Sequence, residues 1–393
     1  MTLRSFSLFL AVICSMIGAS CQRAKNTGSP NALGYIFEPQ PSAVLENLRI
    51  HPSSSPRLGM STSGMVYFPV VYGKEASLGF FMSHNEGDTF MAQAPVSAPG
   101  MHVIAHGEAS PALAIAPEQI YLVWQQEDSQ GTQLLAARSL DWGHSFQKAV
   151  TIADQRRPSY SGFSSVAVAP NGDVYVVWLD GRDPQPSVPG CVSPTGTFSV
   201  YLARSTDHGA SFGKGIRVAL GSCPCCRPNV AFGPKGEIFV AWRKVFPGDV
   251  RDIVVATSHD EGASLSEPVR VSIDNWKIPG CPDSGPALGA VGSRLYVAWL
   301  SEGENEPGIR LSYSDDGAVS FTKPVIASGN VINPNHPALS VAEEGSVLMA
   351  FQGRDPKANA GWTPLAPWLV KVGASGSISS PKFQGTKDRC PIL

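Results

Sequence analysis

Charge is scarce in this chain of 393 residues. Asp, Glu, Lys and Arg make up only 16% of it, against about a quarter of an ordinary domain. The 30 basic and 32 acidic residues leave a net charge of −2, and there is no basic run. The sequence therefore lacks the positive patch with which proteins bind nucleic acid, and we expect no such partner. Beyond the N-terminal segment, no apolar run is long enough to cross a membrane.

Glycine and proline, by contrast, are abundant. The 39 Gly and 33 Pro residues form about 18% of the chain, against roughly 12% in an average protein. Both residue types interrupt regular structure, so they argue against long helices and favour many short strands joined by tight turns. With 43% hydrophobic residues the chain can bury a large core, which excludes a disordered protein.

The first 20 residues are typical of a secretory signal. Arg4 precedes a short apolar stretch at 6–17, and small residues at 18–20 lead to Cys21. A cysteine at this place resembles the lipobox of bacterial lipoproteins, in which it is acylated, and ordinary signal-peptidase cleavage is the alternative. We expect export to the bacterial periplasm or cell envelope, a lipid anchor at Cys21 as the only membrane attachment, and a flexible tether over 21–34.

An eight-residue motif recurs through the rest of the chain. It reads Ser-x-Asp/Asn-x-Gly-x-Ser/Thr-aromatic at 83–90, 139–146 and 205–212, and ends in Leu265 at 258–265. A fifth copy, placed at 315–321, carries one extra residue and lacks the leading Ser in register. Asp or Asn caps its own backbone in such a turn, Gly takes a positive φ, and the aromatic ring packs the turn onto a sheet. These residues are therefore interpreted as structural.

A pair of strands accompanies each unit. Apolar alternation around a Gly, Pro or Asn turn, which is typical of a hairpin, occurs at 111–124, 165–178, 229–242, 286–299 and 337–351, with a looser start at 63–72. Six units of 50 to 60 residues predict an all-β, six-bladed propeller with four antiparallel strands per blade. We expect one domain over 35–393, monomeric, with a strand from 34–45 closing the ring, because closure removes an exposed edge.

The repeated motif and its period resemble the Asp-box (BNR) repeats of the sialidase superfamily over roughly residues 45–375. The resemblance implies a six-bladed propeller with each box between the third and fourth strands of a blade. Sialidases bind the sialate carboxylate with three arginines and use a Tyr–Glu pair as nucleophile and an Asp as acid/base. Arg243 matches one arginine of this triad, and Arg49, Arg57 and Arg310 are weaker candidates.

Two departures from the sialidase pattern put the covalent mechanism in doubt. At the position of the family's Glu the chain reads Cys226-Arg227-Pro228, and at that of its Tyr it reads Asn335-His336-Pro337. Without this pair there is no evident nucleophile. Tyr160 and Glu108 are the nearest substitutes on the same face.

The propeller topology places one set of loops on the face opposite the boxes. A ring of arginines there suits an anionic ligand, because guanidinium pairs bidentately with carboxylate or phosphate. Catalytic candidates on this face are Arg243, Arg227, Arg354, Glu108, Tyr160 and Asp180, and ligand-binding candidates are Arg182, Arg251, His106, Asp283 and His336. We expect this face to bind a small anionic or sugar-like ligand. The alternative is an exo-glycosidase of the sialidase type that removes sialic acid or another acidic sugar.

Six cysteines remain after Cys14 and Cys21. Five lie on neighbouring loops of this face, namely Cys191, Cys223, Cys225, Cys226 and Cys281, and the sixth is Cys390. In an oxidising compartment they allow three disulfides, for example between Cys191 or Cys281 and the Cys223 group, or a vicinal bond between Cys225 and Cys226. The alternative is a soft-metal site for Cu or Zn built from Cys223, Cys225, Cys226 and Cys281. No other cofactor is expected.

Overall fold

The computed structural model describes residues 57–383, except for short segments. These are 62, 86–88, 94, 98–100, 129–130, 153–159, 186–195, 279, 304–305, 342–345, 358–364 and 374–375. The signal segment, the tether with Cys21, the closing strand at 34–45, Arg49, Cys191 and Cys390 lie outside the described residues, so the expectations for them stay predictions. In the part that is described, no helix is long and apolar enough to span a membrane.

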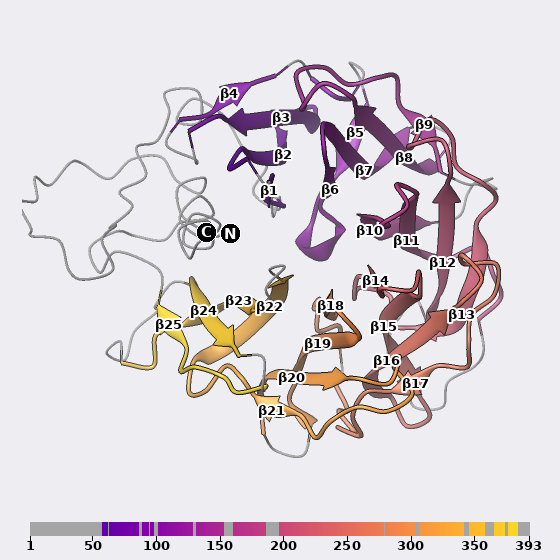
Figure 1. The fold of residues 1–393 in the computed structure, drawn as a ribbon. Helices are drawn as coiled ribbons and strands as arrows, with labels where there is room; N and C mark the ends of the chain where they lie inside the picture. Colours follow the sequence, from indigo (N-terminus) through magenta and orange to yellow (C-terminus); the bar gives the residue numbers. More distant parts are fainter. Residues whose placement is uncertain are drawn as a thin grey trace, which may run out of the picture.

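Six antiparallel blades surround a common centre as a propeller (Figure 1), and blades three and four are joined into one eight-stranded sheet by the pair Ser222 and Lys244. Blade one has β1 (Gly59–Met60), β2 (Val66–Tyr72), β3 (Ser77–Ser83) and β4 (Met91–Ala92). Blade two has β5 (His102–Ile104), the 3-10 helix η1 (Gly107–Ala109), β6 (Ala112–Ala116), β7 (Gln119–Asp128), β8 (Gly131–Ser139) and β9 (Val150–Thr151). Blade three has β10 (Ser161–Val168), β11 (Val174–Asp180), β12 (Phe198–Ser205) and β13 (Ile216–Ser222).

The second half of the chain continues this order. Blade four has β14 (Asn229–Phe232), β15 (Ile238–Phe246), β16 (Val250–Ser258) and β17 (Val269–Arg270). Blade five has β18 (Ala287–Val291), β19 (Arg294–Ser301), β20 (Gly308–Ser314) and β21 (Val325–Ile326). Blade six has β22 (Ile332–Val341), β23 (Val347–Arg354), β24 (Ala366–Val372) and β25 (Lys382–Phe383). The predicted all-β propeller of four-stranded blades is confirmed.

The core lies between neighbouring blades. The second strands of blades two to five each bring one tryptophan that is almost completely buried, namely Trp124, Trp178, Trp242 and Trp299. Five of the seven apolar clusters of the described residues combine residues of two adjacent blades. One of them, for example, joins β11 of blade three to β15 of blade four. A large aromatic side chain removes about 150–250 Å² from water, so these contacts hold the blades as a rigid frame for the loops at the centre.

The boxes occupy the turn between the third and fourth strands of five blades, as the resemblance implies. In blade two, Ser139 Oγ donates to Asp141 at 2.6 Å and accepts from Gly143 N at 2.8 Å, and Ser145 Oγ donates to Asp141 at 2.6 Å. Gly143 has φ 90°, a conformation that costs glycine nothing. The box is thus a self-contained hydrogen-bonded turn.

The fifth box was placed in the wrong register by the sequence motif. Ser314 Oγ donates to Asp316 at 2.7 Å and accepts from Ala318 N at 2.9 Å, and Ser320 Oγ donates to Asp316 at 2.5 Å. The copy therefore spans 314–321 with its leading Ser and no extra residue. Ala318, at φ 69°, stands where the other boxes have Gly, and Gly317 misled the alignment.

The innermost strand is interrupted in several blades. In blade two, β5 and β6 both pair with β7 and η1 lies between them. In blade three the register of β10 shifts between Gly162 and Ser165, and in blade six that of β22 shifts twice between Ile332 and Ala338. These breaks leave the innermost strand of each of these blades without a continuous ladder of paired residues.

Candidate functional site

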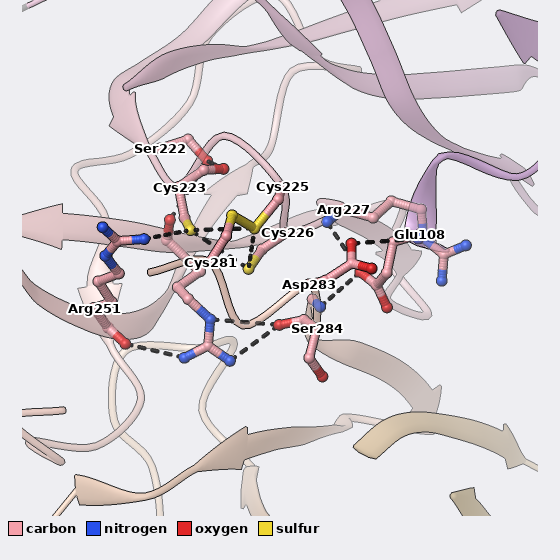
Figure 2. The surroundings of a disulfide bond; sticks show 12 residues. Glu108, Ser222, Cys223, Cys225, Cys226, Arg227, Arg251, Cys281, Asp283 and Ser284 are labelled. Atoms are coloured by element: carbon pink, nitrogen blue, oxygen red, sulfur yellow. Dashed lines mark hydrogen bonds between the residues drawn. A yellow bond between two sulfur atoms is a disulfide. The ribbon is translucent and has the colours of Figure 1, made fainter. Parts of the chain in front are cut away.

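Glu108, in η1, connects loops of four blades. Its Oε2 accepts hydrogen bonds from Arg227 N at 3.1 Å and Gly285 N at 2.6 Å, and its Oε1 lies 3.3 Å from His336 Nδ1. Its own N–H donates to Asp283 Oδ1 at 3.4 Å. We name Glu108, Arg227, Asp283 and His336 the axial cluster; Figure 2 shows its first three members. The structure thus brings together four residues that the sequence analysis placed on one face.

The pKa of Asp283 in the axial cluster is raised. Burial raises the pKa of Asp283, and the negative charge of Glu108 raises it further, while His336 and His106 act in the opposite direction. Burial lowers the pKa of the nearby Arg57, and Glu108 and Asp283 oppose this. Arg57, a weak candidate in the sequence, therefore shares the electrostatic environment of the cluster.

The backbone around the cluster is strained. Asp283 has φ 45°, His336 φ 52° and Phe163 φ 51°, and the ring of Phe163 lies 5.6 Å from that of His106. Non-glycine residues avoid this left-handed region, and each such residue costs about 1–3 kcal/mol. Strain of this kind persists only where the surroundings enforce it, and it is concentrated at functional sites.

Buried polar atoms without partners gather beside the cluster. Among the described residues, Tyr160 Oη and both amide atoms of Gln125 make no hydrogen bond of good geometry, and the same holds for Nε of Arg57 and of Arg227. Burial raises the pKa of Tyr160 well above its ordinary value and Asp283 adds to this, while the neighbouring Gln125 opposes it. More than nine in ten buried polar groups in proteins are satisfied, so this concentration needs a cause.

Gln125 and Gly285 were missed by the sequence analysis. Gln125 directly follows Trp124 in β7, opposite the break in the innermost strand. Gly285 packs so closely that a Cβ there would lie 2.0 Å from Arg227 O and 2.8 Å from Glu108 Oε2. Gln125 directly follows the repeated hairpin at 111–124, and Gly285 directly precedes the one at 286–299. These positions were the only signal in the sequence.

Arg243 does not have the geometry of a carboxylate-binding arginine. It is fully buried, and its guanidinium donates to three carbonyl oxygens, Arg251 O at 3.0 Å, Ser284 O at 3.0 Å and Leu300 O at 2.9 Å. It also lies 4.9 Å from the Trp276 ring. Its hydrogen-bonding capacity is used within the protein, which differs from the role that the resemblance implied.

Two of the remaining predicted residues, Asp180 and Arg182, pair with each other. Asp180 is fully buried, accepts from Trp178 Nε1 at 2.8 Å and forms an ion pair with Arg182 at 2.7 Å, all within blade three. Arg354 is half-buried at the end of β23, opposite Ile332 in the register. The interpretation of Asp180, Arg182 and Arg354 as site residues stays a prediction.

The cysteines lie next to the axial cluster on the same two loops (Figure 2). Cys225 and Cys281 form a disulfide, which agrees with the expected pairing of Cys281 with the Cys223 group and contradicts a vicinal bond between Cys225 and Cys226. Within the part of the chain that is described, Cys223 and Cys226 form no disulfide, and both are fully buried. The sulfur atoms of Cys223, Cys225 and Cys281 lie within 4.8 Å of one another, close enough to hold a metal ion.

Arg251 provides positive charge to this sulfur cluster. It is fully buried, pairs with Asp249 at 2.9 Å, and donates from Nη1 to Cys223 Sγ at 3.4 Å. The hydrogen bond from Cys226 lowers the pKa of the Cys223 thiol, and Arg251 and Arg243 lower it further. Burial raises the pKa of Cys226. Arg251 thus faces sulfur rather than an open ligand site.

No protein-family model and no curated protein sequence matches this chain. Solved structures match it in fold. An intramolecular trans-sialidase from Ruminococcus gnavus aligns with TM-score 0.53 at 10% identity, over 88% of this chain and 97% of that protein. An α-L-arabinofuranosidase from Fusarium graminearum aligns with TM-score 0.55 at 13% identity, over 83% and 95%. The Hadza microbial sialidase Hz136 aligns with TM-score 0.45 at 14% identity, over 81% of this chain but only 65% of its own length.

These identities are evidence of fold alone. The chain is a sialidase-like propeller, similar in architecture to glycosidases of more than one specificity. The resemblance read from the boxes is confirmed at this level, and the substrate remains to be proposed from the site itself.

Proposed function

We propose that the axial cluster binds a carbohydrate, with small acidic sugars as the first candidates. The observation that supports this is the set of buried polar atoms around it that make no hydrogen bond of good geometry, on Tyr160, Gln125, Arg57 and Arg227. Sugar hydroxyls both donate and accept hydrogen bonds, so they complement such a mixed set. His336 of the cluster and Arg57 beside it would pair with a sugar carboxylate. The structures similar in fold include complexes with an iminosugar inhibitor and with oseltamivir carboxylate.

Calorimetric titration of the full-length chain tests this proposal. N-acetylneuraminic acid, glucuronic acid and arabinobiose serve as the probes. At least one should bind, and His336→Gln or Asp283→Asn should weaken it about tenfold or more, the effect of losing a hydrogen bond to a charged group. The matched control is Glu267→Gln, an exposed residue after the box of blade four, which should leave the affinity unchanged. No binding of any probe, or unchanged affinity in both site variants, would overturn the proposal.

Hydrolysis of a glycosidic bond at the same cluster is a second candidate. The raised pKa of Asp283 keeps this carboxyl protonated to a higher pH than that of a free Asp, which suits a general acid. The raised pKa of Tyr160 disfavours a phenolate nucleophile. Fluorogenic α-sialosides and α-L-arabinofuranosides are the substrates to assay. Turnover should fall as the pH rises through the pKa of Asp283, and it should vanish in Asp283→Asn. If the chain binds sugars but turns over none of these substrates, the site binds carbohydrate without hydrolysing it.

For the neighbouring cysteines we propose a different ligand, a thiophilic metal ion such as Cu⁺ or Zn²⁺. The supporting observation is the proximity of the sulfur atoms of Cys223, Cys225 and Cys281. Thiolates are the preferred ligands of both ions. Metal analysis of the purified chain after loading and desalting tests this, and a reduced protein that retains no metal would contradict it.

A further inference from the structure

Three cysteine sulfurs form a triangle of the size that a tetrahedral metal site requires. The Sγ–Sγ distances are 3.9 Å from Cys223 to Cys225, 3.9 Å from Cys225 to Cys226 and 3.5 Å from Cys226 to Cys223. In a tetrahedral zinc–thiolate site with metal–sulfur bonds of about 2.3 Å, each edge between sulfurs is about 3.8 Å. The Cys-Pro-Cys-Cys turn therefore holds its three sulfurs at the separation that one face of such a tetrahedron needs.

The fourth sulfur is present but bonded. Cys281 lies in the disulfide with Cys225, and its sulfur is within 4.8 Å of that of Cys223. A disulfide sulfur has no anionic lone pair to offer a metal, since the thiolate is the metal ligand. Breaking this one bond would release a thiol next to the triangle and make Cys225 a thiol as well.

We propose that these four sulfurs alternate between two exclusive states, the Cys225–Cys281 disulfide and a four-cysteine metal site, so that reduction switches metal binding on. The proposal rests on the metal binding proposed above and adds Cys226 as a ligand and the regulation of binding by reduction. A dithiol reductant would break the bond between Cys225 Sγ and Cys281 Sγ and become a disulfide itself. Its two electrons and two protons would pass to Cys225 and Cys281. The metal would then displace the thiol protons of the four cysteines to solvent.

The burial of the four cysteines matches such a switch. Cys281 is exposed and Cys225 half-buried, so a reductant reaches the disulfide from solvent, whereas Cys223 and Cys226 are fully buried beneath it. Four thiolates and one divalent metal ion together have a net charge of −2. The buried guanidinium of Arg251, which donates to Cys223 Sγ at 3.4 Å, compensates part of that charge as an outer hydrogen-bond partner of a metal ligand.

The switch is tested on the full-length protein in two preparations, one oxidised and one reduced with a phosphine and desalted without oxygen. Each is incubated with Zn²⁺, Cu⁺ or Co²⁺ and desalted, and bound metal is measured per chain. We expect about one ion per reduced chain, as one tetrahedral site predicts, and little in the oxidised chain. Reduced protein with Co²⁺ should show the visible absorption of tetrahedral cobalt–thiolate, and bound metal should protect the cysteines from reoxidation.

Two matched variants separate the two states. Cys226→Ser removes a ligand and keeps the disulfide, so its disulfide should form normally while metal binding by the reduced protein falls about tenfold or more. Cys281→Ser removes both the disulfide and one ligand. Its metal binding should therefore be weakened and should be equal with and without reductant. Equal metal binding by oxidised and reduced wild type would overturn the switch and leave metal binding standing. No binding in either state, with no cobalt spectrum, would overturn both.

Discussion

Glu108 and Gly285 are joined across 177 residues of sequence by a 2.6 Å hydrogen bond from the glycine N–H to the carboxylate. The same oxygen accepts from Arg227 N, so one buried side chain of blade two holds the loops that lead into blades four and five. The disulfide between Cys225 and Cys281 connects these two loops a second time. The position of Asp283 therefore depends on two independent links.

A side chain at position 285 should break the first link. Gly285→Ala would place Cβ 2.0 Å from Arg227 O and 2.8 Å from Glu108 Oε2, so the loops must separate. We expect a loss of about 1–3 kcal/mol in the free energy of unfolding, the usual cost of overpacking, together with weaker sugar binding. Urea denaturation measures the first effect. Gly280→Ala, whose Cβ would meet no atom within 4 Å, is the control, and equal stability of both variants would contradict the close packing.

Arg243 should prove structural. Arg243→Met would leave the carbonyl oxygens of Arg251, Ser284 and Leu300 without their buried donor. Because each unsatisfied buried group costs about 1–3 kcal/mol, we expect a loss of roughly 3 kcal/mol or more, measured by chemical denaturation. Lys235→Met, at an exposed turn, serves as the control. A variant with wild-type stability and no ligand affinity would instead support the carboxylate-binding role.

The boxes should make the propeller sensitive to acid. Hydrogen bonds from Ser264 and Ser320 lower the pKa of Asp260 and of Asp316, each to about 2, against about 3.9 in an unfolded chain. Both carboxylates thus contribute stability that is complete above about pH 4 and is lost as the pH falls toward 2. Ser320→Ala should reduce this acid dependence, seen as a smaller fall in Tm between pH 5 and pH 2.

Ser293→Ala is the matched control for the acid series. Ser293 is exposed in the turn between β18 and β19 and is not among the hydrogen-bond partners that lower the pKa of Asp260 or Asp316. Its substitution should leave the fall in Tm unchanged. If the Tm of Ser320→Ala falls as much as that of the wild type, the box carboxylates contribute nothing to the loss of stability at low pH.

Loss of the disulfide should lower stability without removing the fold. The bond closes a loop with a sequence separation of 56 residues, and such cross-links stabilise by about 2–4 kcal/mol. The Tm of Cys281→Ser should therefore lie below that of the oxidised wild type and close to that of the reduced wild type. Reductant should not lower the Tm of this variant further. Peptide mapping of the oxidised protein should recover the linked Cys225 and Cys281 peptides. Recovery of Cys225 linked to Cys226 would contradict the structure.

Much of the fold could be predicted because its signals are local. A box such as Ser139 to Phe146 closes hydrogen bonds within four residues, and each hairpin shows its alternation within one segment, so period and spacing suffice. The one misplaced box failed because Ala318 adopts the positive φ that the motif reserves for glycine. Only the hydrogen bonds of Ser314 and Asp316 identified the correct register.

The amino-acid sequence by itself determined the six repeating units, the face on which Glu108, Asp283 and His336 lie, and the crowding of the cysteines there. Only the tertiary structure decided that Arg243 bonds to buried carbonyls, that Gln125 and Gly285 belong to the site, and that Cys281 pairs with Cys225. The reason is physical. Turns and strands arise from contacts a few residues apart, whereas the partner of a buried polar atom or a thiol is chosen by the packing of blades far apart in the chain.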